Sequence, residues 1–574
     1  MKRLSFRLVS LVLALVMALG AFGTTFAQGN TLNILYWQAV SILNPYLSGG
    51  TKDLEAASLI LEPLAWFGPE GELVPALAAD IPTLENGGIS EDSTQITWTL
   101  KEGIVWSDGT PFTASDVVFT WEYCTNPETG CSGLSFYDGV TEVVAVDDLT
   151  VQVTFEAPQP YPYLPFVSYS APILQEAQFA ECTGAAAATC TDQNFGPIGT
   201  GPFMVETFLP NDVVEFVANP NFRGAAEGKP YFQRVVFKGG GDAESAARAV
   251  LETGEMDYAW NLQISPEILN SMEAAGMGQV IVGFAGSLER ILLNQTNASS
   301  DLPEGVRSTN VDGSNPHPFL TNPVISHAMS MAIDRTIISE QLYGPGGQAL
   351  CNVVSGPPRN VSPNNDDCLT QDIEGANAML DEAGIVDSDG DGIREYEGTP
   401  LSVLYQTSTN AVRQSTQALI KQWWSEIGIE TELRNIDSSV FFGGDPSSPD
   451  TYQKFYADVE MFTSGTNGPD AQSFLVRWIC GEFPGPENGW LGRNVPRHCD
   501  PEYDALYEEL TAESDPERRS ELTIQLNDIL IENGAIIPLI YRADVSAVSN
   551  TIEGIQMNGW DTELWNIEDW TRAE

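Results

Sequence analysis

Basic residues are scarce in this chain of 574 residues, which has 26 lysines and arginines against 79 aspartates and glutamates and a formal net charge of −53. Such a surface repels nucleic acid and anionic lipid, so neither is expected as a partner. The surplus of acids favours neutral or cationic ligands only weakly. We therefore interpret most of it as a solvated acidic coat.

Enzyme motifs are also missing. The chain has no G-x-S-x-G nucleophile elbow and no H-E-x-x-H zinc motif. Residues 224–230 (GAAEGKP) have one residue too few between their glycines for a phosphate loop, and Pro230 stands where a serine or threonine would hold magnesium. The run 239–241 (GGG) breaks the G-x-G-x-x-G spacing at Glu244. Acidic pairs are abundant because acids are abundant, so a glycosidase gains no positive support. No catalytic residue is predicted.

Long apolar runs are limited to one, at the start of the chain. Lys2 and Arg3 precede the apolar residues 8–19, and small residues follow. This pattern is typical of a signal peptide over 1–27, with the mature chain starting near Gln28. The run is short for a membrane span, and no cysteine near the cut offers a lipid anchor. We expect an exported, soluble protein in a periplasm or at a cell surface.

Histidine is rare: the chain has three, and all three are expected to be structural. No C-x-x-C pair occurs either. A metal site is therefore the weaker interpretation of the eight cysteines, and disulfides in an oxidising compartment are the stronger one. The simplest of the roughly 105 connectivities joins sequential neighbours, each bond contributing ~2–4 kcal/mol. These couples are Cys124 with Cys131, Cys182 with Cys190, Cys351 with Cys368, and Cys480 with Cys499.

Length and periodicity indicate an α/β protein of more than one domain. The chain is too long for one core, so two or three domains are expected. Residues 400–406 (PLSVLYQ) are strand-like, a helix is predicted around 411–426, and the strand-like run 428–433 (GIETEL) follows. The order strand, helix, strand predicts parallel α/β units.

The stretch 100–122 (LKEGIVWSDGTPFTASDVVFTWE) predicts a turn followed by a helix. Asp108-Gly109 supplies the positive φ of a tight turn. Thr113 can cap the helix that follows, with Asp116 in the capping-box position. Nothing in this stretch is catalytic, and Asp108 is predicted to be a turn residue.

Seven separate stretches, in order along the chain, resemble the extracytoplasmic solute-binding proteins of ABC importers, specifically the large family 5 of peptide and nickel type. One such motif would be weak, whereas seven in order over nearly the whole mature chain are specific. They are 106–117 (WSDGTPFTASDV), 198–203 (IGTGPF), 219–222 (NPNF), 254–257 (GEMD), 328–335 (AMSMAIDR), 427–429 (IGI) and 537–539 (IPL).

The resemblance implies an α/β fold of the periplasmic-binding-protein type, class II and cluster C, with two α/β lobes around a ligand cleft and an extra subdomain. It places the first lobe in residues 28–62, 196–283 and 536–574. The inserted subdomain would occupy 63–195 and the second lobe 284–535. The implied partner is an ABC permease in the membrane.

In peptide-binding members of this family, a carboxylate just before a D-P-D-like stretch holds the α-ammonium of the ligand. The corresponding region here, 463–470 (TSGTNGPD), keeps Asp470 but has Gly465 or its neighbours at the anchoring positions. An unpaired buried ammonium is costly, so ordinary peptide recognition is in question. Asp470 is a ligand contact or a helix cap. The side chains that offer neutral hydrogen bonds to a solute are Thr463, Ser464, Thr466 and Asn467.

Three tryptophans are candidates for stacking on a sugar ring or an apolar side chain, namely Trp37, Trp260 and Trp490. Core packing is the alternative for each of them. Asn261 and Arg290 flank the predicted crossover between lobes and are further candidate ligand contacts.

Residues 387–393 (DSDGDGI) copy the start of an EF-hand calcium loop. Position twelve is Gly398, where a bidentate glutamate is expected, so the copy departs there. Structural calcium and a plain Asp/Gly-rich loop both remain open, and no other cofactor is expected. The predicted ligands are the side chains of Asp387, Asp389, Asp391 and Glu395 and the carbonyl of Ile393.

The sequence and the resemblance together favour the substrate-binding component of an ABC importer, a monomer that captures a peptide or a similar polar oligomer between two lobes. A carbohydrate receptor of the same family is the alternative within this class. A secreted hydrolase that uses acidic residues and a surface scaffold without a solute are the alternatives from other classes.

Overall fold

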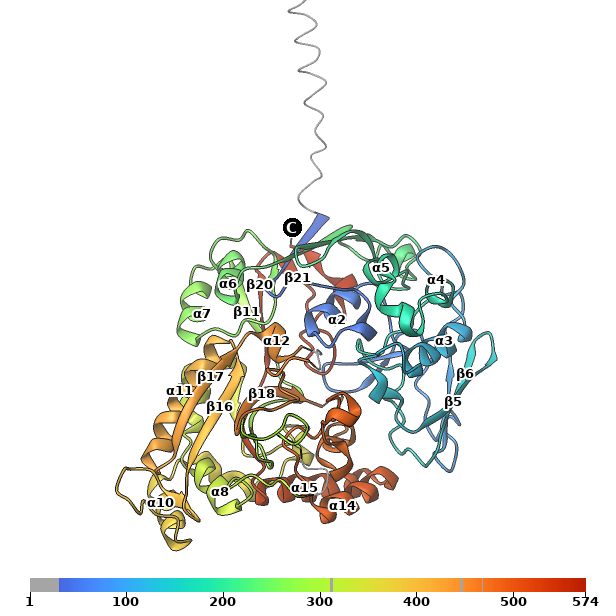
Figure 1. Cartoon of the computed structure of the whole chain (residues 1–574). Coiled ribbons are helices and arrows are strands. Elements are labelled where there is room, and N and C mark those ends of the chain that lie inside the picture. Colours follow the sequence, from blue (N-terminus) through green and yellow to red (C-terminus); the bar gives the residue numbers. More distant parts are fainter. Residues whose placement is uncertain (1–29, 310–312, 444–446, 467, 574) are drawn as a thin grey trace, which may run out of the picture.

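The computed structural model describes residues 30–309, 313–443, 447–466 and 468–573. The predicted signal peptide lies outside these residues. The described part forms two α/β lobes, each built on its own sheet, with a subdomain inserted into the first lobe (Figure 1). Within this part, no helix is long and apolar enough to cross a membrane.

The first lobe is built on a seven-stranded sheet in the order β11-β20-β10-β1-β9-β8-β7. Its central strand β1 (Thr31–Tyr36) alternates half-buried and buried residues, so Leu32, Ile34 and Tyr36 enter the core. β1 runs parallel to both β9 and β10. The helices α6 (Ala243–Leu251) and α7 (Pro266–Glu273) pack on β10 and β20 through a small apolar core. The other strands are β7 (Phe203–Leu209), β8 (Val213–Ala218), β9 (Arg234–Gly239), β10 (Tyr258–Ala259), β11 (Gly278–Gly283) and β20 (Asp544–Ser549).

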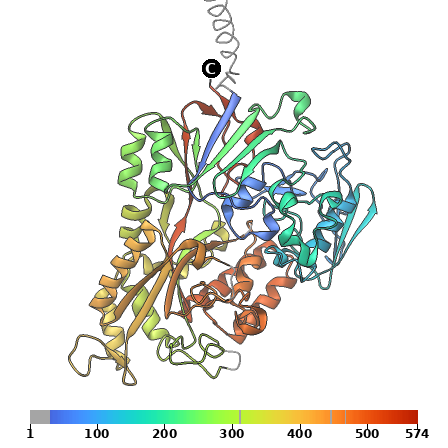
Figure 2. The ribbon, with the colours of Figure 1, turned by 45° about the horizontal axis from the view of Figure 1, so that its top comes forward.

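The inserted subdomain carries a three-stranded antiparallel sheet, β4-β6-β5, and the helix α3 (Ala114–Thr125), and it lies against the first lobe (Figure 2). The predicted turn is present, because Asp108 accepts hydrogen bonds from the N–H and the hydroxyl of Thr110 at 2.9 and 2.6 Å. The predicted capping position is confirmed as well: Asp116 accepts a hydrogen bond from the N–H of Thr113 at 3.0 Å. The strands are β4 (Gln95–Thr99), β5 (Val140–Asp147) and β6 (Thr150–Phe155).

The second lobe is built on a six-stranded sheet in the order β13-β19-β12-β18-β16-β17. The predicted strand–helix–strand unit is confirmed as β16 (Ser402–Ser408), α11 (Ala411–Glu426) and β17 (Glu430–Ile436), with the two strands parallel. One face of the sheet packs on α8 (Pro323–Met331), α10 (Ile373–Glu382) and α11, and the other on α14 (Pro501–Ala512) and α15 (Pro516–Glu532). The remaining strands are β12 (Ser287–Leu293), β13 (Gly347–Ala349), β18 (Val459–Gly465) and β19 (Ile536–Arg542).

The chain crosses between the lobes twice, at residues 284–286 between β11 and β12, and at Ala543 between β19 and β20. The second crossing differs from the expected boundary, which assigned all of 536–574 to the first lobe. β19 instead pairs with β12, with Ile537 opposite Ile291. Both side chains are buried in the core of the second lobe, and this apolar pairing holds the strand there.

Four disulfides confirm the predicted pairing of sequential cysteines: Cys124–Cys131, Cys182–Cys190, Cys351–Cys368 and Cys480–Cys499. Their sequence separations run from 7 to 19 residues. Two of the bonds lie in the inserted subdomain and two in the second lobe. Because every bond is local, none of the four ties one lobe to the other.

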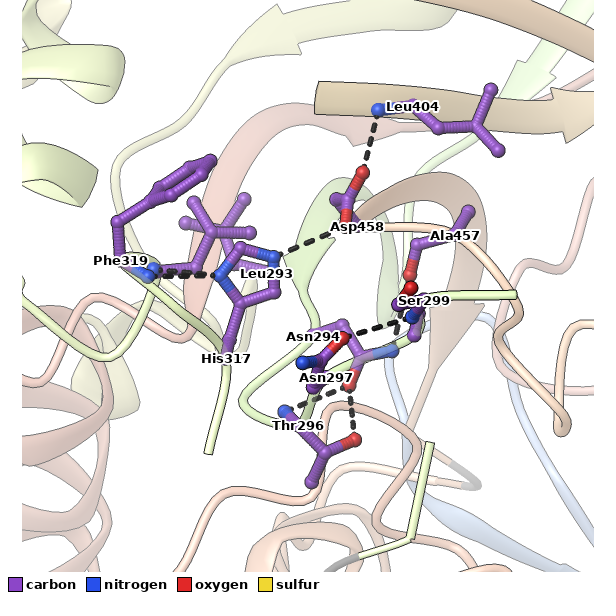
Figure 3. Close-up of polar contacts among 12 residues, drawn as sticks. Leu293, Asn294, Thr296, Asn297, Ser299, His317, Phe319, Leu404, Ala457 and Asp458 are labelled. Carbon is purple, nitrogen blue, oxygen red and sulfur yellow. Dashed lines mark hydrogen bonds and ion pairs between the residues drawn. The ribbon is translucent and has the colours of Figure 1, made fainter. Parts of the chain in front are cut away.

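A polar network joins the strands of the second lobe at the ends that point away from the crossings (Figure 3). The Asp458 carboxylate accepts hydrogen bonds from the N–H of Leu404 at 2.7 Å and from Nε2 of His317 at 3.1 Å. His317 Nδ1 accepts from the N–H groups of Phe319 and Leu320, so Nε2 carries the proton that His317 donates. This histidine therefore serves the fold.

Candidate functional site

The carboxyl ends of the parallel strands in the two sheets meet where the chain crosses between the lobes. β1 and β10 of the first lobe end at Tyr36 and Ala259, and β16 and β18 of the second lobe end at Ser408 and Gly465. Strand ends of this kind are where α/β proteins place ligands. We call the space between these four strand ends the cleft.

The lobes are in contact at the cleft. Asn410, at the start of α11, donates a hydrogen bond from Nδ2 to Oε1 of Gln263 at 2.6 Å. Arg542, at the end of β19, donates from Nη2 to Oδ1 of Asn261 at 3.0 Å. Farther out, Arg493 of the second lobe pairs with Asp138 of the inserted subdomain at 2.8 Å. The structure is therefore closed around the cleft.

The second-lobe wall of the cleft holds a buried ion pair. Arg413 Nε lies 2.9 Å from Oε1 of Glu289, and Thr463 donates its hydroxyl to Oε2 of Glu289 at 2.6 Å. Arg542 donates in turn to the Thr463 hydroxyl at 3.0 Å. Burial by itself would raise the pKa of Glu289, but the charges of Arg413 and Arg542 outweigh it and hold that pKa below its ordinary value. The wall thus carries an ionised glutamate and two arginines.

The first-lobe wall holds acids without such partners. Glu563 accepts hydrogen bonds from Ser546 Oγ at 2.6 Å and from the hydroxyl of Tyr258. Glu55, on α2 (Thr51–Ala57), accepts from the hydroxyl of Thr562. Burial, followed by the charge of neighbouring Asp544, raises the pKa of Glu563 to about 8. Burial also raises the pKa of Glu55.

Asp544 is the most solvent-exposed of these three acids. It begins β20 directly after the crossing and is half-buried. Its carboxylate accepts no hydrogen bond from any described residue. Burial raises its pKa, and the positive charge of Arg542 partly offsets that effect.

The predicted aromatic residues Trp37 and Trp260 both lie at the strand ends of the first lobe, where they pack against other residues. Trp260 is 5% exposed and stacks on Tyr36, with ring centroids 4.7 Å apart. Trp37 is half-buried and donates from Nε1 to the carbonyl of Asn261 at 3.0 Å. Asn261 has a φ of 56°, in the left-handed region that asparagine tolerates, and its side chain faces Arg542.

The remaining predicted residues fall in different places. Asp470 pairs with Arg519 at 2.8 Å and accepts from the N–H of Gln472 at 3.0 Å, so its carboxylate is occupied at the start of α13 (Gln472–Leu475). Trp490 packs edge-on against Tyr456 in a loop of the second lobe. Thr466 Oγ1 is buried without a hydrogen-bond partner. Asn467 lies outside the described residues.

Arg290 and Ser464 point to the opposite face of the second-lobe sheet from Glu289 and Thr463, because neighbouring residues of a strand alternate between faces. Both line a separate cavity of about 190 Å³.

The acidic loop predicted to bind calcium brings its carboxylates together. One oxygen from each of Asp387, Asp389, Asp391 and Glu395 lies within 4.8 Å of the others, and the three aspartates are exposed. Asp387 accepts hydrogen bonds from the N–H groups of Gly390 and Gly392 at 2.7 and 2.9 Å. The loop is thus wrapped around its first aspartate.

Sequence reasoning missed Glu289, Arg413, Arg542 and the acids of the first-lobe wall. A signal existed for Glu289, since two adjacent charges interrupt the otherwise apolar strand SLERILL. No comparable signal marks Glu55, Asp544 or Glu563, because acids occur throughout the chain.

Two α/β lobes, two short crossings and a polar cleft between strand ends define a two-lobed solute-binding protein. The family model described as "Bacterial extracellular solute-binding proteins, family 5 Middle" matches residues 72–482, and the chain belongs to this family. The resemblance drawn from the seven sequence motifs is thereby confirmed.

Relatives and solved structures agree. A protein of Brucella ovis named as an ABC transporter peptide-binding protein is 24% identical over 74% of this chain and 72% of its own length. The glutathione-binding protein GsiB of Salmonella paratyphi A is 22% identical over 89% of each chain. The oligopeptide-binding protein AppA from Bacillus subtilis, solved with a nonapeptide, superposes with a TM-score of 0.75 at 21% identity over 95% of this chain and 99% of its own. NikZ from Campylobacter jejuni, solved with Ni(L-His), also gives a TM-score of 0.75 at 21% identity, over 95% and 100%.

Proposed function

We propose that this protein is the substrate-binding component of an ABC importer and that it captures a short peptide between its lobes. Family membership supports the binding role, and relatives named for peptides and glutathione favour a peptide. The observation that carries the peptide assignment is the contrast between the cleft walls, with acids on the first lobe and arginines on the second. A peptide carries both charges, so its ammonium and carboxylate groups match the two walls.

Asp544 is the group we assign to the ligand's ammonium. Its carboxylate is half-buried and lacks a hydrogen-bond donor among the described residues, whereas Glu55 and Glu563 are occupied by Thr562, Tyr258 and Ser546. A bound ammonium would favour the ionised form of Asp544 and lower its pKa. This assignment supplies, from the first lobe, the anchor that residues 463–470 of the second lobe lack.

Ligand contacts to both lobes favour the closed form, which the membrane permease then recognises. The protein makes and breaks no covalent bond, and other subunits of the importer hydrolyse ATP. It acts as a monomer that is exported by a signal peptide over 1–27.

The carbohydrate alternative gains no support from the relatives cited. Trp260 is covered by Tyr36, and Trp37 is half-buried against the small core of the first lobe, so both rings take part in core packing. The peptide is therefore the better supported ligand.

Native mass spectrometry of the protein purified from its own host tests the proposal. Collisional release is expected to yield short peptides, which stay intact on longer incubation with the protein. Release of an oligosaccharide would overturn the peptide assignment, and turnover of the peptides would support a hydrolase instead.

We also propose that the loop 387–395 binds a structural calcium ion. The support is the convergence of four carboxylates within 4.8 Å, a set of hard oxygen ligands suited to a hard cation. The ion would offset the mutual repulsion of these acids and stabilise the loop.

A further inference from the structure

A cavity of about 190 Å³ lies in the second lobe beside β12 and β18. It is lined by aromatic side chains, among them Tyr452, Phe462 and Trp478, and by three arginines, which are Arg290, Arg477 and Arg493. Thr463 and Ser464 also line it, and these two residues stand at the end of β18 that faces the cleft. The cavity therefore adjoins the region where a solute would bind, and its volume suits a side chain of a ligand.

Two of these arginines, Arg290 and Arg477, lack anionic partners. Arg290 is 3% exposed, and its Nε and Nη1 have no hydrogen-bond partner. Its guanidinium lies 4.9 Å from the ring centroid of Phe462. Arg477 Nε is also buried without a partner, and its guanidinium lies 5.6 Å from the ring of Phe474. An uncompensated buried cation is costly, and two in one cavity also repel each other.

Acids near the cavity do not neutralise these charges. Burial raises the pKa of Glu460 to about 8, so this residue is mainly protonated at neutral pH, and it accepts a hydrogen bond from Gln406 at 2.9 Å. Glu482 and Asp138 both form ion pairs with Arg493, at 2.7 and 2.8 Å, so they are not available to the other two arginines.

Arginine keeps its proton at neutral pH, so both side chains are cations. Burial, followed by the charge of Arg477, lowers the pKa of Arg290 to about 9, which is still above neutrality. Among the described residues, no carboxylate forms an ion pair with either arginine. A chain with a net charge of −53 thus keeps a locally cationic, desolvated cavity.

We propose that this cavity binds a carboxylate of the ligand between Arg290 and Arg477, with Ser464 as a further donor. The inference rests on the proposed function and narrows it, because a peptide supplies a carboxylate either from an aspartate or glutamate side chain or from its C-terminus. Guanidinium groups bind carboxylates through paired hydrogen bonds. The Ser464 hydroxyl is also buried without a partner, so a bound carboxylate would satisfy three side chains at once.

The test is calorimetric titration of the full mature chain, freed of endogenous ligand, with four synthetic tripeptides. These are Ala-Glu-Ala and Ala-Gln-Ala, each as the free acid and as the C-terminal amide. Loss of the carboxylate that enters the cavity is expected to weaken binding about tenfold or more. A drop on changing Glu to Gln identifies the side chain as its source, and a drop on amidation identifies the C-terminus.

Variants tie the effect to the cavity. Arg477→Gln, at the half-buried arginine, is expected to abolish the preference for the charged peptide. It is also expected to raise the Tm of the ligand-free protein, because it removes the repulsion of Arg290. Arg518→Gln, on the exposed face of α15, is the matched control and is expected to keep the preference.

The failures are distinguishable. If all four peptides bind with equal affinity, or if Arg477→Gln keeps the preference, the carboxylate site is overturned while peptide binding stands. If none of the four binds, the proposed function itself is contradicted.

Discussion

Two glutamates on opposite walls of the cleft are almost equally buried and yet differ in charge. Glu289 on the second lobe is 1% exposed and Glu563 on the first lobe is 3% exposed. The pKa of Glu289 lies below its ordinary value, whereas the pKa of Glu563 is raised to about 8. Glu289 faces Arg413, and Glu563 faces Asp544.

The neighbours of a buried acid, more than its depth of burial, decide whether it is ionised. The carboxylate of Glu289 forms an internal ion pair with Arg413 and holds that arginine in place. On the first-lobe wall, Glu55 and Glu563 accept hydrogen bonds from hydroxyl groups but have no ion-pair partner among the described residues, and Asp544 has neither. They are therefore the groups that a cationic part of a ligand would stabilise.

The largest effect is expected from Arg413→Met, which leaves Glu289 buried and ionised without its main partner. Loss of one partner of a buried ion pair costs about 3–5 kcal/mol of the free energy of unfolding. Urea denaturation of the ligand-free protein measures this loss.

The double variant Glu289→Gln, Arg413→Met is expected to recover much of that loss, since it removes both charges. Arg518→Met on the protein surface serves as the control and is expected to cost less than about 1 kcal/mol. An Arg413→Met loss no larger than this control would contradict the buried-pair interpretation.

The two glutamates should give opposite pH dependences. Glu563 has an ordinary pKa of 4.5 and a folded pKa of about 8, so between these values the native chain holds a proton that the unfolded chain has released. Stability then falls as the pH rises, by at most ~1.4 kcal/mol per pH unit. Glu563→Gln is expected to flatten this slope.

Glu289 contributes in the other direction. Its folded pKa is lowered, so its stabilisation is complete above the unfolded pKa and is lost as the pH falls through the folded value. Glu289→Gln is expected to remove part of the acid sensitivity. Urea unfolding of both variants over a range of pH values checks the two signs, and equal slopes in both would refute the comparison.

Asp544→Asn tests whether the first-lobe wall binds the ammonium group of a ligand. Affinity for Ala-Gln-Ala with a free ammonium is expected to fall about tenfold, because the charge-assisted hydrogen bond is lost. The N-acetylated peptide should show no such loss. Asp212→Asn, at the exposed turn between β7 and β8, is the matched control. Calorimetric titration measures the affinities, and an equal fall for both peptides would reject Asp544 as the ammonium anchor.

The smallest effect on stability is expected from calcium binding to the exposed acids of the loop 387–395. Calcium at ten times its Kd is expected to raise the free energy of unfolding by about 1.4 kcal/mol. Asp389→Asn with Asp391→Asn should abolish this gain, whereas Glu397→Gln, which lies outside the cluster of four carboxylates, should keep it. Thermal unfolding with and without calcium provides the measurement. If calcium does not raise the Tm of the wild type, the calcium site is contradicted and the segment is a plain acidic loop.

Local features were predictable from the sequence because they depend on neighbours along the chain. The turn at Asp108, the capping position of Asp116 and the unit β16-α11-β17 follow from spacing alone. The four disulfides were predictable for the same reason, since the paired cysteines are at most 19 residues apart.

The candidate site was predictable only in part. Trp37, Trp260 and Asn261 directly follow strands whose ends form the cleft, and Thr463 lies near the end of β18 in the stretch that the family resemblance singled out. The charged groups beside them were not predictable. Glu289 and Arg413 are 124 residues apart, and Tyr258 and Glu563 are 305 residues apart.

The family, the α/β class and the local geometry were thus readable from the chain alone, because periodicity, turn residues and motif order act over short spans. The membership of β19 in the second lobe and the ionisation of the buried acids followed only from the three-dimensional fold. The physical reason is that both outcomes depend on long-range pairing. Closing the sheets buries a few of the 79 acids and leaves the rest in water, and the partner that each buried acid meets then sets its charge.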